Sequence, residues 1–144
     1  MRQMAIVADD DPDVLALLAK ELRREGFDVQ TAGTGTELVE LVKRALAQGK
    51  LPSIIVSDVT MPEGSGLWAL RRLREQFPRL PFILMIGSGD EEAQSVALEL
   101  GPSAVLHKPI NRRDLDVVVR ALLPDSPPSH RPRRRKKEPR RLAS

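Results

Sequence analysis

The chain alternates five short apolar runs with five helical stripes, and no other feature of the sequence restricts its fold as much. Most of the runs are apolar at consecutive positions rather than at every second one, which indicates strands buried on both faces. Five repeats of strand then helix predict a doubly wound α/β fold with one parallel sheet and right-handed crossovers. The predicted strands are Met4–Ala8, Phe27–Thr31, Ile54–Ser57, Phe82–Ile86 and Ala104–His107.

The helical stripes carry apolar residues three and four positions apart, the spacing that places side chains on one face of a helix. Asp11-Pro12 predicts the start of the first helix, since Asp is a good N-cap and proline suits the first helical position. Asn111 is the expected cap of the last helix. The stripes begin at Val14, Leu38, Leu70, Ala93 and Leu115 and end at Leu22, Leu46, Phe77, Leu100 and Leu122.

Charged residues stand where three of the predicted strands end. Asp9-Asp10-Asp11 follows the first strand, Asp58 the third and Lys108-Pro109 the fifth. In an open sheet of strand order 2-1-3-4-5, ligands bind at the carboxyl ends of strands one and three, where the strand order reverses. We therefore expect Asp9, Asp10 and Asp58 to converge, although 48 residues separate Asp10 from Asp58.

The chemistry of this cluster indicates a magnesium and phosphate site. Carboxylate oxygens are hard ligands that suit Mg²⁺, and a neighbouring lysine indicates an anionic partner such as a phosphoryl group. Helix capping accounts for Asp11, and a turn before Met61-Pro62 would account for Asp58 taken alone. Neither helix capping nor a turn explains why Asp9, Asp10 and Lys108 also stand at strand ends.

These motifs resemble the receiver domain of two-component response regulators, the flavodoxin-like fold of the CheY type. The resemblance covers residues 4–123 and rests on the segments Ile6 to Pro12, Ser57 to Pro62 with Gly66-Leu67, and Lys108-Pro109. It implies one receiver domain over residues 1–123, and because no segment typical of a second folded domain follows in residues 124–144, a stand-alone receiver is expected. It also implies a phosphoacceptor rather than an enzyme, located in the cytoplasm.

The resemblance assigns a role to each site residue. Asp58 would accept a phosphoryl group from the phosphohistidine of a histidine kinase or phosphotransfer protein, because phosphoryl transfer needs mainly positioning and charge neutralisation. Asp10, Asp58 and the backbone carbonyl of Thr60 would bind Mg²⁺, with Asp9 acting through a metal-bound water. Lys108 would pair with Asp58 and then with the phosphoryl oxygens. The peptide bond before Pro109 is expected to be cis.

Two positions depart from the family pattern. A Thr or Ser normally ends the fourth strand, 22 residues before the lysine, and its hydroxyl binds the phosphoryl group; here that position is Ile86. The residue three before the lysine, often aromatic, is Val105. Ser88 offers a hydroxyl two residues late, and a shift of its glycine-rich loop would bring it toward the site; otherwise Ser88 is an ordinary loop serine. The metal and acceptor residues are retained while the switch is atypical.

Composition limits the other possibilities. The chain contains no cysteine, which excludes disulfides, zinc–thiolate sites and thiol catalysis. No signal peptide or membrane-length apolar segment is visible. The charge is unevenly distributed, since residues 124–144 hold eight Lys/Arg and two acids while the overall net charge is +3. This proline- and arginine-rich segment has too few apolar residues to fold alone and is predicted to be a disordered basic tail.

Two functions remain open from the sequence. The first is a phosphorylation-controlled receiver that signals to a downstream protein through its fourth helix, last strand and last helix. The second is a binding module with a receiver fold that acts independently of phosphorylation, with its tail contacting nucleic acid, a membrane or a protein. Through residues 131–141 the contact with nucleic acid or an anionic surface would be weak and salt-sensitive; a merely solubilising tail is the alternative.

Overall fold

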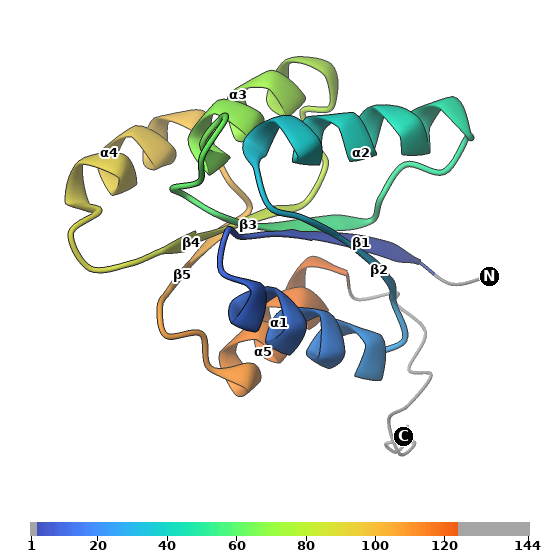
Figure 1. Ribbon diagram of the computed structural model, residues 1–144, viewed down its shortest axis with the longest axis horizontal. Helices are drawn as coiled ribbons and strands as arrows, with labels where there is room; N and C mark the ends of the chain where they lie inside the picture. The colour runs from blue at the N-terminus through green and yellow to red at the C-terminus, as the bar shows by residue number, and fades with distance from the viewer. Residues whose placement is uncertain (1–2, 124–144) are drawn as a thin grey trace, which may run out of the picture.

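The computed structural model describes residues 3–123, and these form one parallel sheet covered by helices on both faces (Figure 1). The strand order is β2-β1-β3-β4-β5, as predicted. Phe27 is outside the second strand, which begins one residue later than expected, and the third strand extends through Asp58. The strands are β1 (Met4–Ala8), β2 (Asp28–Ala32), β3 (Ile54–Asp58), β4 (Phe82–Ile86) and β5 (Ala104–His107).

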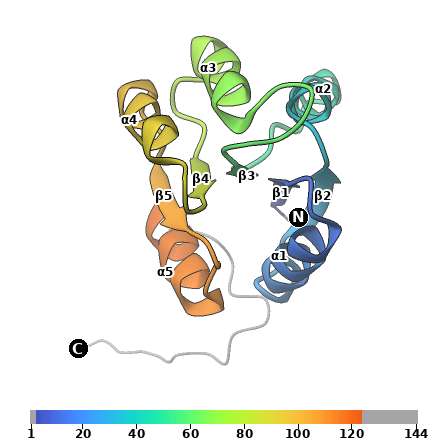
Figure 2. The ribbon, with the colours of Figure 1, turned by 60° about the vertical axis from the view of Figure 1, so that its left-hand side comes forward.

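The five helices divide unequally between the two faces of the sheet. Figures 1 and 2 show α2, α3 and α4 together on one face and α1 with α5 on the other. This division follows from the strand order, because the crossovers change face where the chain returns past β1. The helices are α1 (Pro12–Arg24), α2 (Gly35–Ala47), α3 (Gly66–Gln76), α4 (Glu91–Leu100) and α5 (Arg112–Leu122).

Each face of the sheet has its own apolar core. Successive side chains of a strand point to opposite faces, so Leu84 and Ile86 of β4 join the core beneath α2, α3 and α4, while Ile83 and Met85 join the core beneath α1 and α5. Strands β3 and β4 are buried at every position. The prediction of strands buried on both faces is therefore correct for the centre of the sheet, whereas β2 is an edge strand with exposed residues.

Side-chain caps begin four of the five helices. Asp11 and Asn111 cap α1 and α5, which confirms both sequence predictions, while Thr34 and Ser65 cap α2 and α3. The exception is α4, whose N-cap residue Asp90 makes no capping hydrogen bond. The start of α4 is therefore built differently from the start of the other helices.

The predicted basic tail, residues 124–144, lies outside the residues that the structure describes. The same holds for the contact predicted for residues 131–141. Within residues 3–123, no helix has both the length and the apolar character needed to cross a membrane.

Candidate functional site

Three of the strand-end residues meet around one ammonium group. Asp9 follows β1, Asp58 ends β3 and Lys108 follows β5. Lys108 Nζ lies 2.9 Å from Asp9 Oδ2 and 3.0 Å from Asp58 Oδ2. The Asp9 side chain has no solvent-exposed surface, and that of Asp58 is 9% exposed. One partly exposed lysine therefore balances two buried carboxylates.

The backbone around these residues holds each carboxylate in place. Asp9 donates its N–H to the carbonyl of Ala32, and its Oδ1 accepts the N–H of Asp11 at 2.9 Å. The N–H of Thr60 lies 3.5 Å from Asp58 Oδ1, a long hydrogen bond. Lys108 donates its own N–H to the carbonyl of Ile86 at 2.8 Å. Neighbouring strands thus position all three charged groups.

Helix α3 begins directly against the backbone of β3. Gly66, its first residue, donates its N–H to the carbonyl of Val59. A Cβ atom at Gly66 would lie 2.0 Å from the carbonyl oxygen of Asp58. Only glycine can therefore start the helix this close to β3. The start of α3 packs against the backbone of Asp58 and helps to hold it in place.

Burial and neighbouring charges act in opposite directions on the pKa values of Asp58 and Lys108. Burial raises the pKa of Asp58 above its ordinary value, and the negative charge of Asp9 adds to this effect, while Lys108 and the N–H of Thr60 oppose it. Burial alone would lower the pKa of Lys108, but its contacts with Asp9 and Asp58 outweigh burial and raise it. The contact with Lys108 therefore offsets only part of the effect that burial and Asp9 have on the pKa of Asp58.

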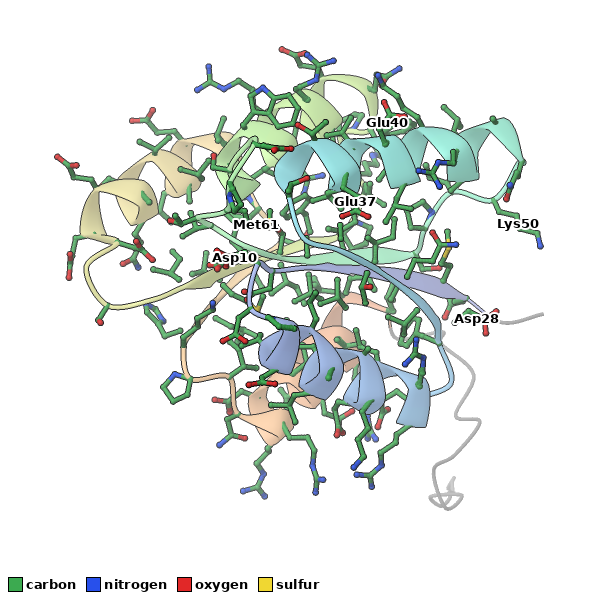
Figure 3. The ribbon with its side chains drawn as sticks, in the orientation of Figure 1. Asp10, Asp28, Glu37, Glu40, Lys50 and Met61 are labelled. Carbon is green, nitrogen blue, oxygen red and sulfur yellow. The ribbon has the colours of Figure 1, made fainter. Side chains whose placement is uncertain are left out.

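The donor set fits a hard divalent cation. Oxygen atoms of Asp9, Asp10 and Asp58 lie within 4.8 Å of one another. The buried Asp9 Oδ2 accepts no well-oriented hydrogen bond among the described residues, so its contact with Lys108 is an ion pair only. Asp10 is exposed and gives the cluster its opening to solvent. In Figure 3, Asp10 and Met61 mark this end of the sheet, while Asp28 and Lys50 mark the opposite end.

The remaining predicted positions do not all join the cluster. The Lys108–Pro109 peptide bond is cis. Ile86 is 2% exposed and belongs to the core beneath α4, against which Val105 packs. Ser88 is exposed in the loop after β4. Ile86 is therefore an apolar core residue and Val105 a partly buried one beside it, and β4 ends without a side-chain hydroxyl.

Sequence reasoning missed one polar residue next to this site. Asp90 Oδ2 accepts the N–H of Gly87 at 2.8 Å, just after β4. The available signal was an aspartate directly before the acidic first turn of α4, Glu91 and Glu92. That pattern is typical of a helix cap, and the structure shows a different contact.

Comparison with known proteins agrees with the fold. The family described as "Response regulator receiver domain" matches residues 5–120. The alkaline phosphatase synthesis transcriptional regulatory protein PhoP of Bacillus subtilis is 36% identical over 124 residues, which are 85% of this chain and 49% of PhoP. The probable transcriptional regulatory protein TcrX of Mycobacterium tuberculosis is 32% identical over 118 residues, 82% of this chain and 48% of TcrX.

The chain spans about half the length of these curated relatives. Among solved structures, a response regulator receiver domain protein from Clostridium thermocellum superposes with a TM-score of 0.76 at 24% identity, covering 85% of this chain and 94% of that one. This chain belongs to the response regulator receiver domain family. Receiver domains are phosphoacceptors that interact with histidine kinases or phosphotransfer proteins.

Proposed function

We propose that this receiver accepts a phosphoryl group on Asp58 in the presence of Mg²⁺ and so controls a signalling output. The supporting observation is the position of Asp58 at the end of β3, with Lys108 Nζ 3.0 Å from one of its oxygens. Two further carboxylates, Asp9 and Asp10, lie beside it. This arrangement combines a nucleophile, a fixed cation and a donor set for a second cation.

The transfer exchanges one bond for another. A carboxylate oxygen of Asp58 forms an O–P bond as the N–P bond of a phosphohistidine breaks, and the histidine nitrogen keeps the electron pair of that bond. Mg²⁺, when bound, neutralises charge on the phosphoryl oxygens. Asp9, Asp10, Asp58 and the carbonyl of Thr60 are the residues that would hold it. Lys108 exchanges its contact with the Asp58 carboxylate for contacts with the phosphoryl oxygens.

The phosphodonor would be a histidine kinase or a phosphotransfer protein in the cytoplasm, and the output would pass through the surface of α4, β5 and α5. On that surface Leu98 is 71% exposed and Val117 is 59% exposed. Exposed apolar side chains of this size suit a protein contact. In this proposal residues 124–144 are a separate tail after the receiver domain.

Phosphorylation is tested by intact-mass measurement after incubation with Mg²⁺ and a small phosphodonor such as acetyl phosphate. We expect the wild type to gain the mass of one phosphoryl group and the Asp58→Asn variant to gain none. Asp11→Asn is the matched control, because asparagine caps a helix as well as aspartate and Asp11 lies outside the metal cluster. A wild type that gains no mass would contradict the proposal.

Mg²⁺ binding is tested separately by thermal unfolding. We expect Mg²⁺ to raise the unfolding midpoint of the wild type, because a cation relieves the repulsion between the clustered carboxylates. At a concentration one hundred times the dissociation constant the gain is about 2.7 kcal/mol. The Asp10→Asn variant should show a much smaller shift, whereas Asp11→Asn should respond like the wild type. Equal shifts in all three proteins would argue against this site.

A binding function independent of phosphorylation is the second candidate. It is favoured by one observation, the burial of Ile86 where the family places a hydroxyl. If the receiver gains no phosphoryl mass, yet Asp58→Asn keeps the biological output of the wild type, this second function is supported. If the output requires both Asp58 and a phosphodonor, this second function is excluded.

A further inference from the structure

The loop between β4 and α4 is closed by two reciprocal hydrogen bonds between its ends. The N–H of Gly87 donates to Asp90 Oδ2 at 2.8 Å, and the N–H of Asp90 donates to the carbonyl of Gly87 at 3.3 Å. Between them, Gly89 has φ +90°, which suits the third residue of a tight turn. The Asp90 carboxylate therefore holds the first residue after β4 in place.

Because its carboxylate accepts the Gly87 N–H, Asp90 does not cap helix α4. The other four helices begin with a side chain that accepts a backbone N–H, whereas Asp90 makes no such bond. The backbone of Asp90 is at φ −101° and ψ 27°, whereas a capping residue is typically extended. The first N–H groups of α4 consequently lack the side-chain acceptor that the adjacent aspartate could provide.

The N–H held by Asp90 belongs to the residue after Ile86, whose carbonyl accepts the N–H of Lys108 at 2.8 Å. Gly87, Glu91 and Lys108 line one cavity of about 290 Å³, and Lys108 Nζ contacts Asp58 Oδ2. A phosphoryl group on Asp58 would bring strongly accepting, negatively charged oxygens toward this cavity. Oxygens that approach Gly87 would compete for its N–H and would repel the Asp90 carboxylate bonded to it, because like charges repel.

We propose that Asp90 is a latch between the acceptor site and α4. Its carboxylate holds the Gly87 N–H before phosphorylation; when a phosphoryl oxygen on Asp58 takes over that N–H, the carboxylate turns to cap α4. This inference rests on the proposed phosphorylation of Asp58. Phosphorylation of Asp58 would then change the surface of α4 through Asp90, although position 86 is an isoleucine and has no hydroxyl.

The resting contact is tested by amide hydrogen exchange of the full chain, followed by NMR, without phosphodonor. A hydrogen bond to a charged acceptor protects an amide by about tenfold or more. Exchange of the Gly87 amide should therefore speed up by about that factor in Asp90→Ala. Glu92→Gln, which removes a charge from the same turn of α4, and Ser88→Ala should leave it unchanged. An unchanged Gly87 rate in Asp90→Ala would overturn the latch.

The switching step is tested with the same proteins after adding Mg²⁺ and acetyl phosphate, with intact mass measured in parallel. In the wild type the Gly87 amide resonance should shift and the amides of Glu92 and Ala93 should exchange more slowly. Asp90→Ala should still gain phosphoryl mass but lose the response of the α4 amides. Asp90→Ser, whose shorter side chain can cap α4, should show slow α4 exchange before phosphorylation.

The outcomes separate the two proposals. If the wild type gains mass but Gly87 and the α4 amides do not respond, the latch is wrong and the proposed phosphorylation stands. The latch is equally wrong if Asp90→Ala responds like the wild type. If the wild type gains no mass, the proposed phosphorylation fails and the switching step fails with it, while the exchange rate of Gly87 still decides the resting contact.

Discussion

Replacing Gly66 with alanine is expected to destabilise the protein by about 3 kcal/mol or more, because overpacking against rigid atoms is among the costliest single changes. The added Cβ would lie 2.0 Å from the carbonyl oxygen of Asp58, 2.9 Å from its carbonyl carbon and 3.0 Å from Ser57 Oγ. These atoms belong to β3, which is buried at every position. Neither the strand nor the helix can yield without breaking other contacts.

Chemical denaturation of Gly66→Ala beside Gly33→Ala measures this effect. A Cβ at Gly33 would meet only Glu37 Oε1, at 4.0 Å, so this control should change the free energy of unfolding by no more than about 0.5 kcal/mol. Gly66→Ala should also phosphorylate poorly while still folded, because the clash displaces the backbone of Asp58, the proposed acceptor. Equal stability of the two variants would show that β3 and α3 separate easily.

Replacing Lys108 with methionine is expected to cost about 2 to 4 kcal/mol in the absence of divalent cations, because it leaves buried carboxylates without their cation. The Asp9 side chain is fully buried and cannot turn to solvent. The lysine side chain is 26% exposed, so water would compensate part of the loss. Mg²⁺ should recover some of the stability, since its positive charge also balances Asp9 and Asp58.

The test compares denaturation midpoints of three variants with and without Mg²⁺. Lys20→Met, at an exposed position of α1, controls for the loss of a positive charge elsewhere and should be close to neutral. Adding Asp9→Asn to Lys108→Met should restore part of the stability, because one of the two uncompensated carboxylate charges is then removed. If Lys108→Met unfolds like Lys20→Met, the ion pairs of Lys108 contribute nothing measurable to folding.

Local patterns were enough to predict the architecture. The five apolar runs and five stripes correspond to the observed strands and helices, with the second strand shifted by one residue and the third extended to Asp58. Strand order then predicted that acids far apart along the chain would converge, and their oxygens do lie within 4.8 Å of one another. The prediction of strands and helices succeeds because periodicity depends on residue type, and the prediction of convergence succeeds because the sheet has the known five-stranded order 2-1-3-4-5.

Other features depend on the conformation of the folded backbone or on contacts between segments, and the apolar periodicity of the sequence does not encode either. Asp90 precedes an acidic helical turn, as a cap does, but the turn conformation directs its carboxylate to Gly87. Gly66 belongs to a recognisable motif, yet only the packed helix shows that the space beside Asp58 excludes a Cβ.

The sequence by itself determined the strands, the helices and the charged residues at the strand ends, because side-chain periodicity dictates which faces must be buried. Tertiary structure alone decided how those charges pair. One lysine balances Asp9 and Asp58, Ile86 lies in the core beneath α4, and Asp90 holds the loop instead of the helix. Each of these depends on distances of a few ångströms, and such distances exist only once the strands and helices have packed.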